Sequence, residues 1–393
     1  MVNAVTKLRD LDQLAAFFFC FFFVNTIFSL YISGFALWLF VFMPFLSPAF
    51  IRSAAYVRRN IFIIIFLGIS IAIFSLQIVT ALKVVFAYIC VTYVMFLLKH
   101  REFKWFHFFL VTNVCICVVQ FFGYKFLGVK LLDPTFIASL YGDFGLTTGD
   151  TFAEGFLLEY RVSGLNREPA FLSSLLLSGL LLVLYQSKYS GKVKRGLSSG
   201  SKVLIMFYLL GLCLTFSKVT FFLAMLLPLA YALRKLIKSL GPDVVTILFL
   251  LSVSTVVVIF YEFTNIHNFP TSVYHGLSVY HRTIGYYVLY DMNVFDLFLG
   301  VRGDIASLAE YLPYIKNSEW WGHDRLIFDN SGLAQLIIEF GFLSVLPFLF
   351  FMRIAKVDAF KWCLFLLLTV NVNPLTSTSF VILSLAIVFY NGK

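Results

Sequence analysis

Long apolar runs alternate with short polar segments along most of the chain. A helical run of about 20 apolar residues matches the thickness of a bilayer, so each run predicts a membrane-spanning helix. About twelve runs fit this pattern, although the seventh and the last two are short. They cover residues 14–31, 34–51, 61–80, 82–98, 105–123, 169–187, 203–217, 219–234, 243–261, 331–352, 362–375 and 377–390. The pattern predicts an all-α polytopic membrane protein, with residues 1–393 forming a single integral membrane domain.

Two polar segments between the runs are much longer than the rest, residues 124–168 and residues 262–330. Loops of this length in a compact membrane protein are usually functional. In the second, residues 283–299 have the apolar spacing of one or two short amphipathic helices that end at Gly300. Such helices lie along the membrane surface, and Arg282 stands at the expected helix start.

The distribution of charge predicts the orientation in the membrane. The chain is 61% apolar and 13% charged, and its net charge is +10. Most of its basic residues fall in alternate short loops, which places those loops and both termini in the cytoplasm and the two long loops outside. The charge is therefore a topology signal, and nucleic-acid binding, which needs basic residues on one folded surface, is not expected. All six cysteines fall in apolar runs, where they are interpreted as packing residues.

The stretch from Arg161 to Pro169 concentrates charge at the mouth of an apolar run. It holds Arg161, Arg167 and Glu168 on the side where basic residues are otherwise scarce. Cations next to hydrocarbon are costly, so this grouping indicates a site for an anion at the level of the lipid headgroups. The alternative is an ordinary interfacial anchor.

Further polar residues are expected at the same outer level. They are Lys218 in a turn between two runs, Arg282 in the second long loop, and Asp329 and Asn330 before the tenth run. Cations there can hold a diphosphate, and a carboxylate can accept the proton of an attacking hydroxyl. Asp329 is equally suited to cap the next helix. Glu339, an acid inside the tenth run, is either functional or protonated and hydrogen-bonded to a neighbouring helix.

No metal or cofactor motif accompanies these residues. The histidines of the second long loop have no metal-ligand spacing, and neither a phosphate-binding glycine loop nor a nucleophile elbow occurs. We therefore expect neither a metal nor a cofactor.

Four ordered motifs resemble the O-antigen polymerase and O-antigen ligase superfamily, which are membrane glycosyltransferases of the GT-C type. The first is Arg-Val-Ser-Gly-Leu-Asn-Arg-Glu-Pro-Ala at 161–170, and the second is Leu-Thr-Phe-Ser-Lys at 214–218. The third is Ser-Val-Tyr-His-Arg at 278–282, followed by Leu-Gly-Val-Arg-Gly at 299–303. The fourth is Asp-Asn-Ser-Gly-Leu-Ala-Gln-Leu-Ile-Ile-Glu-Phe-Gly-Phe-Leu at 329–343. The resemblance covers about residues 161–350.

The resemblance implies a GT-C-like fold and transfer of a glycan from a polyprenyl-diphosphate-linked oligosaccharide at the periplasmic face of the bacterial inner membrane. The transfer is metal-independent and inverting. Lys218 and Arg282 fall where the family uses basic residues on the carrier diphosphate. Arg282 is also placed among the catalytic residues, with Asp329 and Glu168 as candidate bases. The expected substrate-binding residues are Arg161, Arg167, Lys218, Arg282, Arg302 and Asn330.

Asp329 stands where ligases usually have a histidine before Asn330, which favours a polymerase that extends a lipid-linked repeat unit. The alternative is a ligase that transfers the glycan to lipid A-core. A lipid-linked sugar flippase or transporter is less well supported, because transporters usually have short outer loops and midplane sites. Apart from the bilayer, a chain-length regulator and a flippase are the protein partners that the family implies.

Overall fold

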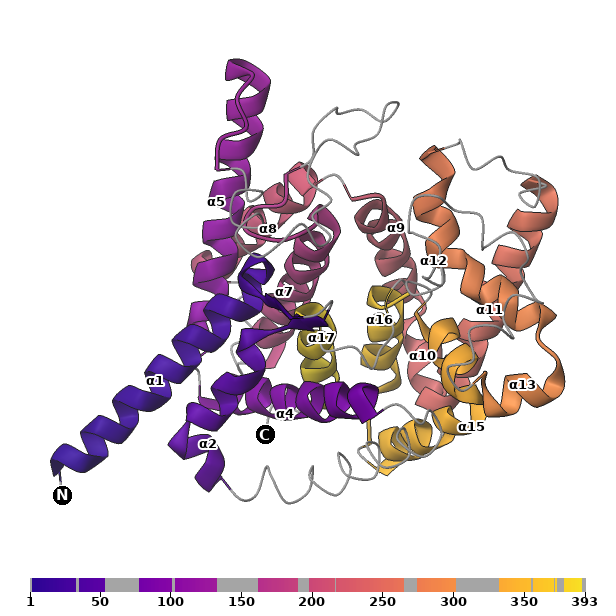
Figure 1. Ribbon diagram of the computed structural model, residues 1–393, viewed down its shortest axis with the longest axis horizontal. Coiled ribbons are helices and arrows are strands. Elements are labelled where there is room, and N and C mark those ends of the chain that lie inside the picture. The colour runs from indigo at the N-terminus through magenta and orange to yellow at the C-terminus, as the bar shows by residue number, and fades with distance from the viewer. Residues whose placement is uncertain are drawn as a thin grey trace. The chain divides into compact units, whose positions relative to one another are not determined.

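A computed structural model describes residues 2–32, 35–53, 78–100, 103–132, 162–189, 198–215, 217–264, 274–301, 332–354, 356–370, 372 and 378–390 (Figure 1). Over these ranges the regular secondary structure is helical except for a short antiparallel hairpin, in which β1 (Leu30–Ile32) pairs with β2 (Phe35–Leu37). The predicted helical architecture is confirmed, with this hairpin as an addition that the apolar pattern did not reveal.

In the described part of the chain, four helices contain segments long and apolar enough to cross a membrane. They are α4 (Ile78–His100), α5 (Lys104–Leu127), α7 (Pro169–Tyr189) and α11 (Pro242–Thr264). These helices coincide with the predicted runs 82–98, 105–123, 169–187 and 243–261, and their length and composition support the predicted membrane character. An α-helix rises 1.5 Å per residue, so the 21 residues of α7 span about 31 Å, close to the thickness of the hydrocarbon layer.

Other predicted runs correspond to helices of varied length. These are α8 (Ser199–Thr215), α9 (Lys218–Ala232), α15 (Leu333–Ile354), α16 (Ala359–Leu368) and α17 (Ser379–Phe389). The total of twelve spans stays a prediction, since most of the run 61–80 lies outside the described residues. Two helices end before Gly300, α12 (Tyr274–Asp291) and α13 (Val294–Leu299), and the predicted amphipathic placement along the membrane surface stays a prediction.

The first two runs fold differently from the prediction. Helix α1 spans Val2–Val24 and is followed by a 3-10 turn, η1 (Thr26–Phe28). The run 34–51 is not one helix: β2 leads into the 3-10 helix η2 (Leu39–Leu46), and a bend at Ser47 separates η2 from the short α2 (Pro48–Arg52). Pro44 and Pro48 explain the break, because proline lacks the amide hydrogen that a continuous helix needs.

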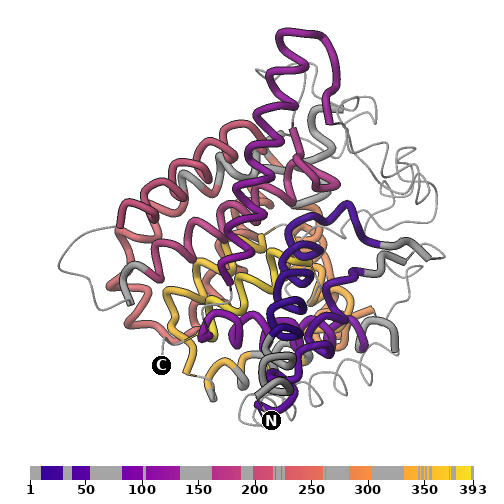
Figure 2. The backbone as a smooth tube through the Cα atoms, turned by 90° about the vertical axis from the view of Figure 1, so that its left-hand side faces the viewer, coloured from indigo at the N-terminus to yellow at the C-terminus, as the bar shows by residue number. Residues whose placement is uncertain are grey.

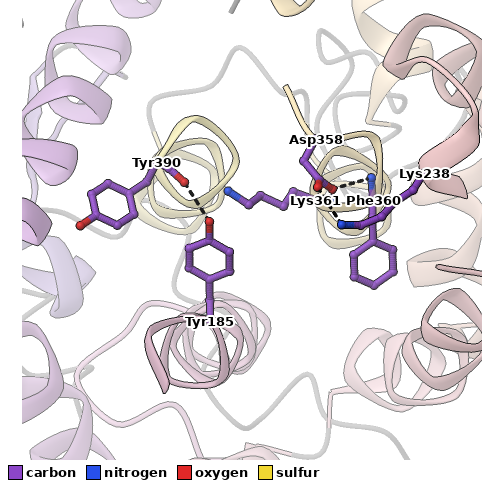
Figure 3. Close-up of polar contacts among 6 residues, drawn as sticks. All are labelled: Tyr185, Lys238, Asp358, Phe360, Lys361 and Tyr390. Carbon is purple, nitrogen blue, oxygen red and sulfur yellow. Dashed lines mark hydrogen bonds and ion pairs between the residues drawn. The ribbon is translucent and has the colours of Figure 1, made fainter. Parts of the chain in front are cut away.

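One compact unit comprises Met1–Arg59, Ile89–Met225 and Thr378–Lys393. Its helices α5, α7 and α8 pack against one another, as both views show (Figures 1 and 2). Gly179 lies against Leu110 of α5 and Tyr208 of α8, so the backbones approach closely, as is usual between membrane helices. Helix α17 packs on α7, where Tyr185 donates a hydrogen bond of 3.1 Å to the Tyr390 carbonyl (Figure 3).

The second compact unit comprises Asn60–Tyr88 and Leu226–Ser377. Helix α11 packs against α12, α15 and α16, and the short α10 (Arg234–Ser239) packs on α16. The fully buried Trp362 donates a hydrogen bond of 2.8 Å from its indole nitrogen to the Thr246 hydroxyl, which joins α16 to α11. This unit contains α12, α13 and α15. The third motif, in the second long loop, and the fourth motif, at the tenth run, therefore both belong to it.

Candidate functional site

Residues 162–168, which carry the first motif, form a buried loop rather than an exposed segment. Gly164 has a φ of +60°, a conformation that glycine adopts without strain. The side chain of Gln120, on α5, bonds both backbone groups of Gly164. Its Oε1 accepts from the Gly164 backbone amide at 3.0 Å, and its Nε2 donates to the Gly164 backbone carbonyl at 3.1 Å. This pairing satisfies backbone groups that burial removes from water.

Asn113 joins this loop to two helices and is itself fully buried. Its side-chain Nδ2 donates to the Asn25 side chain at 2.7 Å, and its side-chain Oδ1 accepts from the Leu165 backbone amide at 2.8 Å. Asn166 also donates to that oxygen at 3.4 Å and accepts from the Thr26 hydroxyl at 3.0 Å. The end of α1, the middle of α5 and the 162–168 loop therefore share one polar network.

Arg167 is held by this network and is only 7% exposed. Its backbone amide donates to the Thr26 hydroxyl at 3.3 Å, and its guanidinium donates to the Ser29 carbonyl at 3.4 Å. The guanidinium also lies over the Trp38 ring, 5.6 Å from the ring centre. Burial lowers the pKa of Arg167 to about 10, and the nearby Glu168 opposes this shift, so the side chain remains charged at neutral pH. These contacts hold Arg167 inside the protein, and both the interfacial anchor and the role in anion binding stay predictions.

The helix register places Glu168 and Lys218 at the same end of the first unit. Gly179 of α7 packs beside Leu110, and Gly211 of α8 packs beside Val114, so the two helices cross α5 at similar heights. Helix α7 begins at Pro169, directly after Glu168, and α9 begins at Lys218, shortly after the end of α8. The backbones of the first two motifs therefore lie at the same end of this unit.

Arg282 does not stand at a helix start, contrary to the prediction. Helix α12 begins at Tyr274, so Arg282 lies within the helix, where its neighbours' amides are bonded along the helix. The reason for the missed start is local: residues 274–282 mix aromatic, polar and glycine residues and contain few aliphatic ones. The expected contribution of free backbone amides next to Arg282 is therefore wrong.

One turn after Arg282, Tyr286 fixes α12 against the start of α15 and the end of α16. Its hydroxyl donates to the Val370 carbonyl at 3.3 Å, and the ring is fully buried. Gly332, with a φ of +56°, lies so close to the Val370 carbonyl that a Cβ atom would be 2.4 Å from its oxygen. The backbone of Arg282 lies one helical turn before Tyr286 on α12.

The motif around Gly300 docks against the fourth motif inside α15. Gly341 breaks α15 with a φ of +74°, and the Val301 amide donates to the Ile338 carbonyl at 2.9 Å. Gly300 and Gly341 touch through their backbones, because a Cβ on Gly300 would be 2.4 Å from the Gly341 nitrogen. The sequence did not predict this contact, which the structure shows between the two motifs.

Glu339 lies just before this break in α15. Its carboxylate accepts from the Gln335 side-chain amide at 2.8 Å, and both residues are partly buried. Gln335 lies on the same helix, and the predicted alternatives, a functional role or a partner on a neighbouring helix, stay predictions. The backbone of Glu339 lies next to Gly300, two residues before Arg302 in the sequence.

Several predicted residues lie outside the described part of the chain: Arg161, Arg302, Asp329 and Asn330. The side chains of Lys218 and Arg282 also lie outside it, and their roles stay predictions. Among the described residues no group of histidine, cysteine, aspartate and glutamate has the arrangement of a metal site.

The buried network around Asn113 was not predicted. A signal was present, because Asn25, Asn113 and Gln120 are polar residues in or beside apolar runs, where such residues usually have a specific partner. Their partners in the loop could not be identified from sequence, since Asn113 and Leu165 are separated by a long loop.

Replacing Asn113 with alanine is expected to destabilise the protein by about 3–5 kcal/mol, because several buried groups lose their partners at once. Thr112→Ala is the matched control. The Thr112 hydroxyl donates only within its own helix, to the Phe108 carbonyl, and removing it should cost less than about 0.5 kcal/mol. Thermal unfolding of the purified variants in detergent measures both. Equal unfolding temperatures for the two variants would show that the network does not hold the loop.

No family model, curated protein or solved structure matches this chain.

Proposed function

We propose that this protein is a polysaccharide polymerase that lengthens an O-antigen type glycan at the outer face of the bacterial inner membrane. It transfers the glycan from polyprenyl diphosphate to a sugar hydroxyl of another lipid-linked repeat unit. The order of the four motifs and their resemblance to the O-antigen polymerase and ligase superfamily support this proposal. The main structural support is the junction at Tyr286, which holds α12 next to the start of α15 one helical turn after Arg282. Asp329 and Asn330 precede that start in the sequence.

The chemistry needs positive charge where the diphosphate leaves. When the acceptor hydroxyl attacks the anomeric carbon, the bond from that carbon to the diphosphate oxygen breaks, and the diphosphate keeps the electron pair. Preorganised cations in a site of low dielectric stabilise this charge. We assign that role to Arg282, Lys218 and Arg161, with Arg167, Arg302 and Asn330 binding the remaining polar parts of the substrate.

The proton of the acceptor hydroxyl needs a base. Glu168 and Asp329 are the proposed candidates, because both carboxylates are expected at the outer level and Glu168 adjoins Arg167. Glu168 adjoins Arg167 at the start of α7, in a loop that Asn113 and Gln120 hold in place. A held loop favours catalysis, because a base must keep its position relative to the attacking hydroxyl. Direct attack inverts the anomeric configuration.

Deletion of the gene tests the proposal and separates it from the ligase alternative. Loss of a polymerase leaves lipid A-core that carries a single repeat unit. Loss of a ligase leaves uncapped core together with carrier-linked polymer. Loss of a flippase leaves repeat units on the cytoplasmic side. Electrophoresis of the lipopolysaccharide and mass analysis of carrier-linked glycans distinguish the three, and an unchanged polymer would contradict the proposal.

A further inference from the structure

Basic residues gather at one end of the second unit, where α10 meets the end of α15 and the starts of α11 and α16. Lys238 of α10 forms a 3.1 Å ion pair with Asp358 before α16 (Figure 3). Arg353 at the end of α15 forms a 3.4 Å pair with Asp243 in the first turn of α11. The guanidinium of Arg234 lies 5.4 Å from the centre of the Phe360 ring. These contacts bring four separate segments together.

This end carries an excess of positive charge. Residues 231–243 and 352–361 contain six basic residues and two acids, hence a formal charge of +4. Both acids are already engaged, and Asp358 additionally caps α16 by accepting from the Phe360 and Lys361 amides. Burial alone would raise the pKa of Asp358, but the Lys361 amide and the Lys238 ammonium outweigh it and lower that pKa, so the carboxylate stays ionised at neutral pH.

Exposed apolar side chains lie beside the basic ones. None of the residues of α10 is buried, and Leu236 is 60% exposed. Leu233 and Tyr231, which precede α10, are 45% and 65% exposed. A short helix that combines exposed lysines with exposed aliphatic and aromatic groups has the composition of a segment lying in the membrane interface.

We propose that this end of the second unit binds the headgroups of anionic phospholipids in the leaflet facing the cytoplasm. The basic surface consists of Arg234, Lys235, Lys238, Arg353 and Lys356. Its charge complements an anionic lipid headgroup, and the apolar residues of and before α10 reach the acyl region next to it. The basic-residue pattern of the short loops, to which these residues belong, predicts that this end faces the cytoplasm. The inference does not depend on the proposed enzymatic activity.

Lys235 and Lys356 are the residues to test, because both are exposed and neither contributes to the two ion pairs that hold the segments together. The purified full chain in nonionic detergent is titrated with short-chain phosphatidylglycerol, and thermal unfolding is followed. We expect saturable stabilisation that weakens with salt. The double variant K235Q/K356Q should need a roughly 10- to 30-fold higher lipid concentration for half of the effect.

The double variant K125Q/K202Q is the matched control, since it removes two exposed lysines from the first unit. It should respond to phosphatidylglycerol as the parent does. Short-chain phosphatidylcholine and inorganic phosphate should give no comparable stabilisation. The inference is overturned if K235Q/K356Q responds like the parent, if phosphatidylcholine stabilises equally, or if inorganic phosphate alone reproduces the effect.

Discussion

Replacing Arg282 with glutamine is expected to lower the rate of glycan lengthening by about 10²- to 10³-fold, because the departing diphosphate loses a fixed positive charge. Glutamine keeps much of the length of the side chain and removes the charge. Arg282→Lys should recover part of the rate, since lysine restores the charge without the two-pronged geometry of arginine. Consumption of lipid-linked repeat units by membrane vesicles, normalised to protein level, measures the effect.

Arg52→Gln is the matched control for this prediction. Arg52 is an exposed arginine in the last turn of α2, outside the proposed site, and its loss should leave the rate unchanged. A normal rate in the Arg282→Gln variant at a normal protein level would remove Arg282 from the mechanism. A loss shared by both variants would point to a general effect of charge on folding or insertion.

The second large effect is expected from Gly300→Ala, which should destabilise the protein by more than about 4 kcal/mol. Gly300 has a φ of +71° and a ψ of 166°, a conformation essentially restricted to glycine. Its Cβ would also lie 2.4 Å from the Gly341 nitrogen and 2.6 Å from the Phe340 carbonyl carbon. These are backbone atoms, so no side-chain rotation relieves the contact, and α13 must move away from α15. Thermal unfolding and the yield of folded protein in detergent report the change.

Two other glycines separate the causes of this loss. Gly128, which ends α5, has a φ of +65° but nothing near its Cβ position, so Gly128→Ala isolates the cost of the backbone conformation, about 1–2 kcal/mol. Gly200 in α8 has open space and no positive φ, and alanine should be neutral or slightly stabilising there. If Gly300→Ala unfolds at the temperature of Gly128→Ala, the close backbone contact with Gly341 carries no stability.

The long apolar runs allowed the helices α4, α5, α7 and α11 to be predicted, because burial in lipid demands both a minimum length and internal hydrogen bonding. The same reasoning failed for residues 34–51, where Pro44 and Pro48 interrupt an apolar run of sufficient length. Apolar content alone does not distinguish a spanning helix from a strand and short helices that are packed within the protein.

The candidate site was predictable in part. Gly300 marked the end of α13, since a glycine after the last apolar position is the usual helix stop. The contact between Gly300 and Gly341 and the network around Asn113 were not predictable. They join residues distant in sequence, and loose motifs carry no information on which backbones approach one another.

The central claim is that cations at the outer face assist the departure of polyprenyl diphosphate from a lipid-linked glycan. Its most direct test is turnover by the purified protein with a synthetic polyprenyl-diphosphate-linked repeat unit, in the presence of a metal chelator. We predict lengthened glycan and stoichiometric release of polyprenyl diphosphate, with both reduced at least 100-fold in the R282Q/K218Q variant. Lengthening by that variant at the parent rate, or release of the carrier as a monophosphate in the transfer step, would contradict the account.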